Sequence, residues 1–215
     1  MVLSSLKVPA DNSALSRGER TRSRVLEAAY DLFVRQGFNG TSVREIAQQA
    51  GMAVGGIYNH YASKEEIFAA VLDAYHPYHT VLPALDSAEG ETVETYLRDA
   101  ARKVRKALTG AETKLMPLVF TELVEFQGRH LQQIADRVMP SLMAFGSRFA
   151  QRRGSLRPIP MPVMLRTFIG LFISHLLSEM VLKGLPSLAQ NDYDWFEGML
   201  EIYLRGILSP EAETP

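Results

Sequence analysis

Residues 41–68 read TSVREIAQQAGMAVGGIYNHYASKEEIF and contain the clearest structural signals in the chain. Ser42 and Glu45 have the spacing of a capping box, in which each side chain accepts a hydrogen bond from the backbone N–H of the other residue. Gly51 is expected to end the short helix that follows, because glycine readily adopts the left-handed conformation found after a helix C-terminus. A further short helical segment, residues 54–61, comes directly after this turn. Two short helices joined by a tight glycine turn predict a helix-turn-helix.

Helical periodicity continues on both sides of this motif. Ser63 and Glu66 predict a second capping box, which opens a helix that runs to about His79. The helices before and after the motif each place apolar side chains on one face. These are Val25, Ala28, Ala29, Leu32 and Phe33 in the first, and Ile67, Phe68, Val71 and Leu72 in the second. The sequence therefore predicts a compact three-helix head, followed by a connecting helix.

The rest of the chain is also helical by pattern, and no segment shows the alternation of a strand. The expected helices cover residues 93–108, 117–126, 129–152, 163–182 and 193–208. Pro117 is expected in the first turn of its helix, whereas Pro140 is expected to kink or split the helix that contains it. Residues 154–162, GSLRPIPMP, are expected to form a loop. The predicted fold class is all-α, with about nine helices.

Composition and charge exclude several classes of protein. The 215 residues include no cysteine, which excludes disulfide frameworks, thiolate metal sites and cysteine nucleophiles. The formal net charge of −1 is unevenly distributed: residues 1–64 hold eight basic and five acidic side chains, and the remainder holds fifteen and nineteen. A basic N-terminal part on an acidic body indicates two parts with different partners.

No segment predicts export, membrane insertion or catalysis. Residues 1–16 lack the apolar core of a signal peptide. The most apolar stretch, residues 168–182, is shorter than the ~20 apolar residues of a membrane span. We therefore expect a cytoplasmic protein with no membrane partner. Neither a phosphate-cradling glycine loop nor an HExxH or Gly-x-Ser-x-Gly motif is present, so no cofactor, no metal and no enzyme activity are expected.

The motif and its surroundings resemble the TetR family of transcriptional repressors. The resemblance covers residues 20–70 and rests on Gly37-Phe38 after the first helix, on the Thr41-Ser42 cap, and on Ile46, Ala47, Ala50, Gly51, Gly55, Tyr58, His60, Tyr61, Ser63, Lys64 and Glu65. It implies a flexible tail (residues 1–16), a helix-turn-helix DNA-binding domain with its connecting helix (residues 17–80), and an α-helical ligand-binding and dimerisation domain (residues 81–215). It also implies a homodimer that binds a near-palindromic operator in double-stranded DNA and responds to a small-molecule effector.

Nine residues are candidates for DNA contact, by analogy with the family. They are Thr41, Ser42, Val54, Gly55, Gly56, Tyr58, Asn59, His60 and Lys64. Thr41 and Ser42 lie at a helix N-terminus, which suits a phosphate oxygen, and the Asn59 amide can bond adenine in two places. Tyr58, His60 and Lys64 resemble the residues that contact phosphates in the family. Taken alone, Tyr58 is more typical of a half-buried packing residue, and only the surrounding motif favours a contact.

Two departures from the family pattern bear on sequence specificity. Ala53 stands where many members have Ser or Thr, so a helix cap worth about 1 kcal/mol is absent. Val54 stands where many members have a polar or basic side chain. The two glycines that follow remove side chains that would read bases, so backbone approach and DNA shape gain weight. Arg20, Arg22 and Arg24 are expected to reach phosphates from the tail and the first helix.

The predicted effector is small and largely apolar, and its candidate contacts lie in the helical body. They are Met116, Phe120, Phe126, Met143, Phe168 and His175, each of which has the alternative of a core residue. Binding of the effector is expected to move the helix from Ser63 to about His79. His76 and His79 are spaced for a shared metal ion. The alternative, a polar helix end, is favoured because no cysteine or carboxylate pair accompanies them.

Dimerisation is expected through residues 163–182 and 193–208, which would pair with the same helices of a second protomer as a four-helix bundle. Their apolar side chains exceed what one core needs. These are Leu171, Phe172, Leu176, Leu177, Met180, Trp195, Phe196, Met199, Tyr203 and Ile207. The cationic face from Arg98 to Lys106 is interpreted as a solvated helix surface, with a membrane-surface contact as the alternative.

The sequence thus predicts a ligand-responsive DNA-binding regulator, a repressor that its effector releases from the operator by a population shift. Two other classes stay open at this point. One is a helical small-molecule or lipid-binding protein whose head no longer binds DNA. The other is an α-helical enzyme whose site the sequence does not display.

Overall fold

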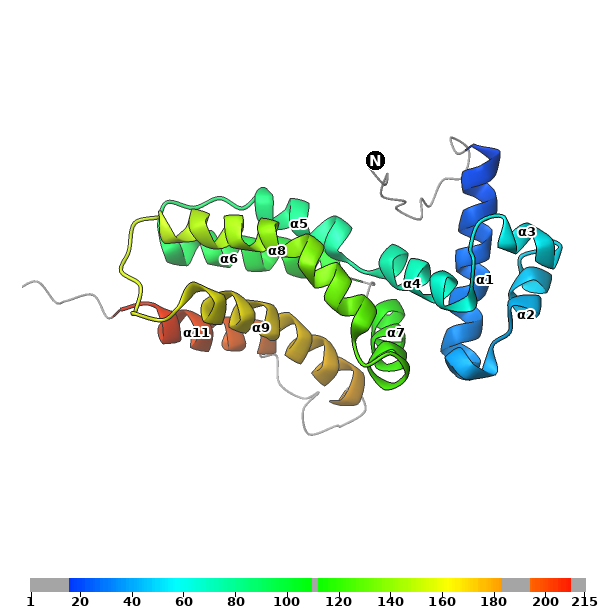
Figure 1. Cartoon of the computed structure of the whole chain (residues 1–215). Coiled ribbons are helices and arrows are strands. Elements are labelled where there is room, and N and C mark those ends of the chain that lie inside the picture. Colours follow the sequence, from blue (N-terminus) through cyan, green and yellow to red (C-terminus); the bar gives the residue numbers. More distant parts are fainter. Residues whose placement is uncertain (1–15, 110–111, 183–193, 210–215) are drawn as a thin grey trace, which may run out of the picture. The chain divides into compact units, whose positions relative to one another are not determined.

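The structure is a computed structural model that describes residues 16–109, 112–182 and 194–209, which are helical apart from turns, loops and two isolated β-bridges. The helices are α1 (Arg17–Gly40), α2 (Val43–Gln49), α3 (Val54–Tyr58), α4 (Lys64–Tyr75), α5 (Tyr78–Asp86), α6 (Val93–Leu108), α7 (Glu112–Glu125), α8 (Arg129–Ala150), α9 (Met161–Leu182) and α11 (Trp195–Ile207) (Figure 1). The predicted all-α fold is confirmed. The predicted tail lies outside the described residues, except for Ser16, which caps α1.

The chain forms two compact units, which we call the head unit and the body unit. The head unit comprises Met1–His79 and Gly110–Arg137, and the body unit comprises Thr80–Thr109 and Val138–Pro215. The first crossing between them follows His79, one residue before the end of the predicted DNA-binding domain at residue 80. The sequence placed no part of residues 110–137 with the head, but α7 packs against α1 and α4. The compact units therefore differ from the predicted domains, which were assigned by function. The functional assignment of those domains stays a prediction.

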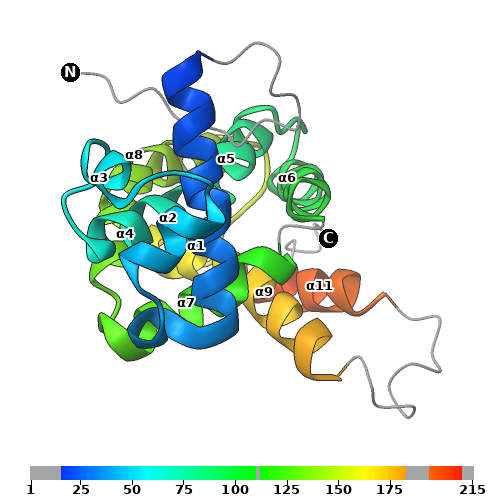
Figure 2. The ribbon, with the colours of Figure 1, turned by 90° about the vertical axis from the view of Figure 1, so that its right-hand side faces the viewer.

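The core of the head unit is built from the apolar faces that the sequence predicts, together with one aromatic side chain from α7–α8. All the predicted inward residues of α1 and α4 are buried. Phe38 and Phe68 pack against each other, and the ring of Phe126 lies 4.7 Å from Phe38 and 4.9 Å from Phe68, centroid to centroid. Such aromatic pairs add to the free energy gained from burial alone. Figure 2 shows the group of helices that this core supports.

The body unit encloses a second core around α6, as the sequence predicts. The predicted face of α6, from Val93 to Leu108, is buried in this core, where α6 contacts α11 and its Tyr96 ring packs against Phe145 of α8. Its cationic face does not simply face solvent. Arg98 pairs with Glu94 and with Glu201 of α11, and Arg105 pairs with Asp194. These ion pairs join α6 to the start and the middle of α11.

Several side chains predicted to form the dimer contact lie instead in the core of their own body unit. These are Leu171, Phe172, Phe196, Tyr203 and Ile207. Other apolar side chains on the same two helices are exposed, namely Val163, Ile173, Met180, Val181, Trp195 and Ile202. Periodicity shows which residues share a helix face, but for a helix that is apolar all round it does not show which face meets the protomer's own core. Residues 183–193 lie outside the described residues.

The predicted connecting helix is shorter than expected. It begins after Ser63 but ends at Tyr75, and His76 adopts an extended conformation with ψ 129°. The cause is Pro77, because proline disfavours the helical conformation in the residue before it. The chain re-enters a helix at Tyr78. A rigid helix to His79 is therefore ruled out.

The prolines of the later helices are accommodated differently from the prediction. Pro117 lies inside α7, beyond its first turn, and Pro140 lies inside α8, which continues as one helix to Ala150. Each removes one backbone hydrogen bond, which surrounding packing compensates. The predicted loop 154–162 is two residues shorter, because α9 begins at Met161 and its first turn tolerates proline.

One helix in the described part of the chain, α9, is long and apolar enough to cross a membrane by length and composition, with a mean hydropathy of 1.4 over Met161–Val181. The apolar stretch predicted from the sequence, residues 168–182, is shorter because the helix begins seven residues earlier, at Met161. A single such helix is weak support for a membrane span, because the core helix of a soluble protein meets the same criteria. Met164, Leu165 and Phe172 of α9 are indeed buried in the body core.

Candidate nucleic-acid interface

The first helix of the predicted helix-turn-helix is closed at both ends by local contacts. Ser42 Oγ accepts a hydrogen bond from the Glu45 backbone N–H at 3.2 Å, and Glu45 Oε2 accepts one from the Ser42 backbone N–H at 2.8 Å. The predicted capping box is thus confirmed. After α2 the chain turns at Gly51, whose φ of +66° is the left-handed conformation that glycine adopts without strain. This turn sets the direction of α3.

The second capping box is only half as predicted. Ser63 Oγ accepts from the Glu66 backbone N–H at 3.1 Å. The Glu66 carboxylate, however, accepts from the N–H of Ala62 at 2.6 Å rather than from that of Ser63. Both contacts still anchor the start of α4 directly behind the turn that follows α3.

The second helix, α3, is short and exposes most of its surface. It ends at Tyr58 rather than at residue 61, and Ala53 provides no side-chain cap, as predicted. Ile57 is fully buried and fixes the helix to the head core. Tyr58 is 55% exposed and Val54 37% exposed, and the two residues after α3 are exposed as well. The structure therefore brings together Val54, Gly55, Tyr58, Asn59 and His60 on an open surface.

The two glycines of α3 differ in their surroundings. A Cβ atom on Gly55 would meet nothing within 4 Å, whereas one on Gly56 would lie 2.8 Å from Cε of Met52. Met52 Cε is the end of a flexible side chain, so a small shift of that side chain would make room for a Cβ atom at position 56. Gly55 leaves an open surface where a DNA backbone or base edge can approach closely.

Thr41 and Ser42 are less available than the sequence suggests. Thr41 is only 2% exposed, and its hydroxyl donates to the Gly37 carbonyl at 2.8 Å. The Ser42 hydroxyl donates to Glu45 Oε2 at 2.7 Å, and the hydrogen bonds from Ser42 lower the pKa of the Glu45 carboxyl below its usual value. A carboxylate therefore already occupies the N-terminus of α2, where a phosphate was expected.

Lys64 makes long-range contacts within the head unit. Its Nζ donates to the carbonyl oxygens of Phe38 at 2.7 Å and of Thr41 at 2.8 Å, and it lies 4.2 Å from the centroid of the Phe38 ring. The ammonium group thus neutralises carbonyls at the C-terminal end of α1, a position that favours cations. A side chain predicted to hold phosphate has a structural role here, and nothing in the local sequence pattern indicates it.

The six candidate effector contacts are divided between the two units. Met116, Phe120 and Phe126 belong to the head unit, and Met143, Phe168 and His175 to the body unit. Phe126 and Phe168 are both buried, the first in the ring cluster of the head and the second against Phe145, Phe172 and Tyr203. The His175 ring lies edge-on to Phe196 at 5.3 Å. Phe120 and Met143 are instead exposed, by 48% and 38%, so the set does not share one core, and its effector-binding role stays a prediction.

The histidines near Pro77 are packed in the head unit. His76 Nδ1 accepts from the Tyr78 backbone N–H at 3.2 Å, and burial lowers the pKa of His76 to about 4. The His79 ring lies 3.8 Å from the Tyr78 ring, centroid to centroid, with the two planes tilted by 36°. The described residues contain no group of three or more His, Cys, Asp or Glu side chains that could hold a metal ion.

The α3 helix buries Ile57 and exposes most of its other residues, and it follows a capped helix and a glycine turn. This is the arrangement of helix-turn-helix DNA-binding proteins. Residues 25–71 match the family model described as "Bacterial regulatory proteins, tetR family". The transcriptional regulator SrpR of Pseudomonas putida is 28% identical over 181 residues, which span 80% of this chain and 78% of SrpR. The transcriptional regulator TtgR, also of Pseudomonas putida, is 32% identical over 106 residues, or 49% of this chain and 44% of TtgR.

Solved structures support the same assignment at the level of fold. A TetR family transcription regulator from Marinobacter aquaeolei VT8 superposes with a TM-score of 0.59 at 21% identity, covering 90% of this chain and 98% of that one. Residues 25–71 thus match the DNA-binding domain of the TetR family, and the relatives of the chain are named as helix-turn-helix transcriptional regulators. Its relatives are regulators of transcription rather than enzymes.

Proposed function

We propose that this TetR-family regulator is a repressor that binds a near-palindromic operator as a homodimer and is released by a small, largely apolar molecule. The observation that supports DNA binding is the exposed surface of α3. Ile57 is the one residue of this helix that is buried in the head core. The TetR family consists of soluble cytoplasmic DNA-binding proteins, and we propose the same location here.

The proposed DNA contacts divide into reading and positioning groups. Asn59 is proposed to read a base, and Val54 to pack on a thymine methyl group. Tyr58 and His60 are proposed to contact phosphates on either side, because both are exposed at the end of α3. Gly55 and Gly56 allow close approach of the DNA.

Thr41, Ser42 and Lys64 are proposed to act mainly by holding α2 and α4 in place. The hydroxyls of Thr41 and Ser42 are bound within the chain, and Lys64 keeps one of its three N–H groups free beyond its two carbonyl contacts.

The proposed dimer contact uses α9 and α11. It is supported by the exposed apolar side chains on these helices, which include Val163, Ile173 and Ile202. Exposed apolar clusters of this kind mark protein–protein contacts. Two-fold symmetry would then present two copies of α3 to successive major grooves.

The proposed release follows a population shift. An effector that prefers the non-binding state by a few kcal/mol suffices to empty the operator. Among the structural neighbours, NalD of Pseudomonas aeruginosa is described as the secondary repressor of the MexAB-OprM multidrug efflux pump, and EbrR as a multidrug binding protein. These descriptions support a repressor with a small-molecule effector.

The test is a selection of genomic DNA fragments with the purified protein, followed by titration of the best fragment at several salt concentrations. If a dimer neutralises eight phosphates, log K against log salt has a slope of about −7. Asn59→Ala is expected to weaken binding to the selected site about 5- to 150-fold, but not to unrelated DNA. Gln133→Ala, which removes an exposed amide from α8, is the control. Failure of the wild-type protein to enrich any sequence would favour the alternative of a ligand-binding protein without DNA function.

A further inference from the structure

We propose that the side chain of Met52, in the turn between α2 and α3, contacts the C5-methyl group of a thymine in the operator and so contributes to sequence specificity. The residues proposed above to contact bases, Val54 and Asn59, both come after this turn. The proposal rests on the proposed DNA-binding function and adds one specificity-determining residue to it.

The turn holds Met52 in place through its backbone. The backbone N–H of Met52 donates to the Ala47 carbonyl at 3.0 Å, directly after Gly51 has turned the chain. The side chain takes no part in this hydrogen bond, and Met52 is only half-buried. Truncation of the Met52 side chain therefore leaves intact the contact that fixes the turn.

The end of the Met52 side chain lies against α3 at Gly56. A Cβ atom on Gly56 would lie 2.8 Å from Cε of Met52, closer than two carbon atoms approach without a shift. The terminal methyl group of Met52 thus occupies the space that a side chain at position 56 would enter. No atom comes within 4 Å of the corresponding point at Gly55. The space beside Gly55 is open, whereas the space beside Gly56 holds a methyl group.

The side of α3 that bears Gly56 also bears Asn59. Residues three apart are neighbours on a helix surface, and Asn59 continues the helical conformation of α3 with φ −72° and ψ −16°. Asn59 is exposed, and Gly56 is half-buried rather than buried. A duplex that presents a base edge to Asn59 and comes close to Gly56 therefore meets the methyl group of Met52.

A thymine methyl group is the feature of a base edge that best matches this side chain. Thymine is the one base with an apolar group at its major-groove edge, and proteins recognise that group by apolar contact. The thioether of methionine is polarizable and its chain is unbranched, so its end adapts to the shape of an apolar surface. Methionine has no hydrogen-bond donor, so it cannot bind the acceptor atoms of the other bases as Asn59 can.

The test replaces single thymines of the selected site by deoxyuridine, which lacks only the methyl group. One thymine of one half-site is replaced at a time, and binding of the purified chain is measured by titration. The wild type is compared with Met52→Ala, Met52→Gln and Met52→Leu. Glutamine ends in a polar amide, whereas leucine stays apolar and conserves most of the volume. Circular dichroism verifies that each variant folds.

The effect is expected at one thymine near the base pair that Asn59 reads, which Asn59→Ala identifies. Deoxyuridine there should weaken wild-type binding about fourfold, which corresponds to ~0.8 kcal/mol for one buried methyl group. Met52→Ala and Met52→Gln should bind the thymine and deoxyuridine duplexes equally at that position. Met52→Leu should keep most of the preference for thymine.

Two variants control for the position and the kind of side chain. Met139→Ala removes an exposed methionine from α8 in the body unit, and should leave every preference unchanged. Val54→Ala should change the preference at a different thymine, since Val54 is proposed to pack on a methyl group of its own.

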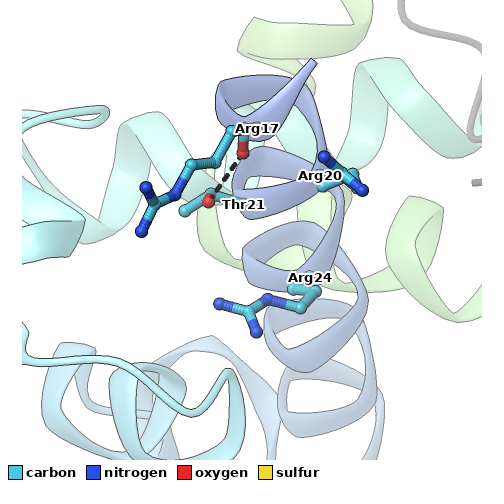
Figure 3. A pocket seen from close by; sticks show the side chains of 4 residues that line it. All are labelled: Arg17, Arg20, Thr21 and Arg24. Atoms are coloured by element: carbon cyan, nitrogen blue, oxygen red, sulfur yellow. Dashed lines mark hydrogen bonds between the residues drawn. The ribbon is translucent and has the colours of Figure 1, made fainter. Parts of the chain in front are cut away.

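A third variant, Arg20→Gln, controls for a general loss of affinity. Arg20 is exposed on α1, where a hollow of about 400 Å³ is lined by Arg17, Arg20, Thr21 and Arg24 (Figure 3). The sequence predicts that Arg20 reaches a phosphate. Its replacement should weaken binding to the thymine and deoxyuridine duplexes by the same factor, because phosphate contacts carry no base information.

The proposal is wrong if the wild type and Met52→Ala show the same preference at every thymine. It is also wrong if Met52→Ala weakens binding to the thymine and deoxyuridine duplexes equally, because the side chain then supports α3 rather than contacting a base. In both cases a site selected by the wild type still supports the proposed function. Absence of wild-type DNA binding overturns both proposals together.

Discussion

Replacement of the buried Glu122 should reveal how the α7–α8 corner is held in the head unit. Glu122 is fully buried, and its two carboxylate oxygens serve different partners. Oε1 accepts from the His130 backbone N–H at 2.7 Å, and Oε2 lies 2.8 Å from Nδ1 of the His130 ring. The other ring nitrogen, Nε2, lies 3.6 Å from Glu65 Oε1 on α4. The buried Glu122 side chain thus binds both the backbone N–H and the ring of His130, which packs against Phe126.

The variants Glu122→Gln and Glu122→Leu separate these contributions. Glutamine keeps an oxygen for the His130 backbone N–H, and its amide can donate to the ring nitrogen once His130 changes tautomer. We expect a loss in the free energy of unfolding of about 1 kcal/mol. Leucine leaves two buried groups without partners, each at a cost of about 1–3 kcal/mol, so we expect a loss of about 2–6 kcal/mol.

The companion variant His130→Leu leaves the Glu122 carboxylate buried without its partner, and should cost about 3–5 kcal/mol. Urea denaturation followed by circular dichroism measures the three losses, and hydrogen exchange of the His130 amide reports the local contact. If the Gln and Leu variants lose the same stability within about 0.5 kcal/mol, the assigned role of Oε1 is wrong.

Three further predictions concern single positions. The depressed pKa of His76, about 4 against an ordinary 6.5, means that the unfolded chain takes up the proton first as the pH falls. Stability from this group is therefore complete above pH 6.5 and decreases towards pH 4, by about 2 kcal/mol at pH 5. The variant His76→Gln should show a flatter pH profile in thermal denaturation, and an unchanged profile would contradict the burial of the ring. Gly37→Ala should cost about 1–2 kcal/mol, because its φ is +74°. Urea denaturation measures this loss, with Gly18→Ala on the same helix as a control. Gly55→Ala should raise the stability by up to about 1 kcal/mol, since its Cβ meets no atom, and yet weaken DNA binding in titrations. Unweakened binding would refute close approach of DNA at Gly55.

The helix-turn-helix could be predicted from the sequence because local interactions determine it. The Ser42 capping box joins residues three apart, and Gly51 ends α2 through its own backbone conformation. The buried faces of α1 and α4 follow directly from helical spacing. The exposed positions of α3 follow in turn, since Ile57 is its one buried residue.

The candidate site was predicted less completely where a side chain has a distant partner. The contacts of Lys64 with two carbonyls cross 23 and 26 residues of sequence. Arg22 is placed by Tyr61 rather than by its own neighbours. A motif shows that a cation is present, but it does not show whether a carbonyl inside the protein has already bound it.

The amino-acid sequence was sufficient for the all-α class, the helix-turn-helix and its outward face, because these depend on hydrogen bonds and periodicity within a few turns. Only the tertiary structure showed that α7 and Phe126 pack in the head unit. It also showed that Leu171 and Phe172 are buried in the body core, whereas Val163 and Ile202 are exposed. The physical reason is that burial depends on which apolar surfaces meet. Several pairings of amphipathic helices remove similar areas from water, so the choice depends on the fit of their side chains across the whole fold.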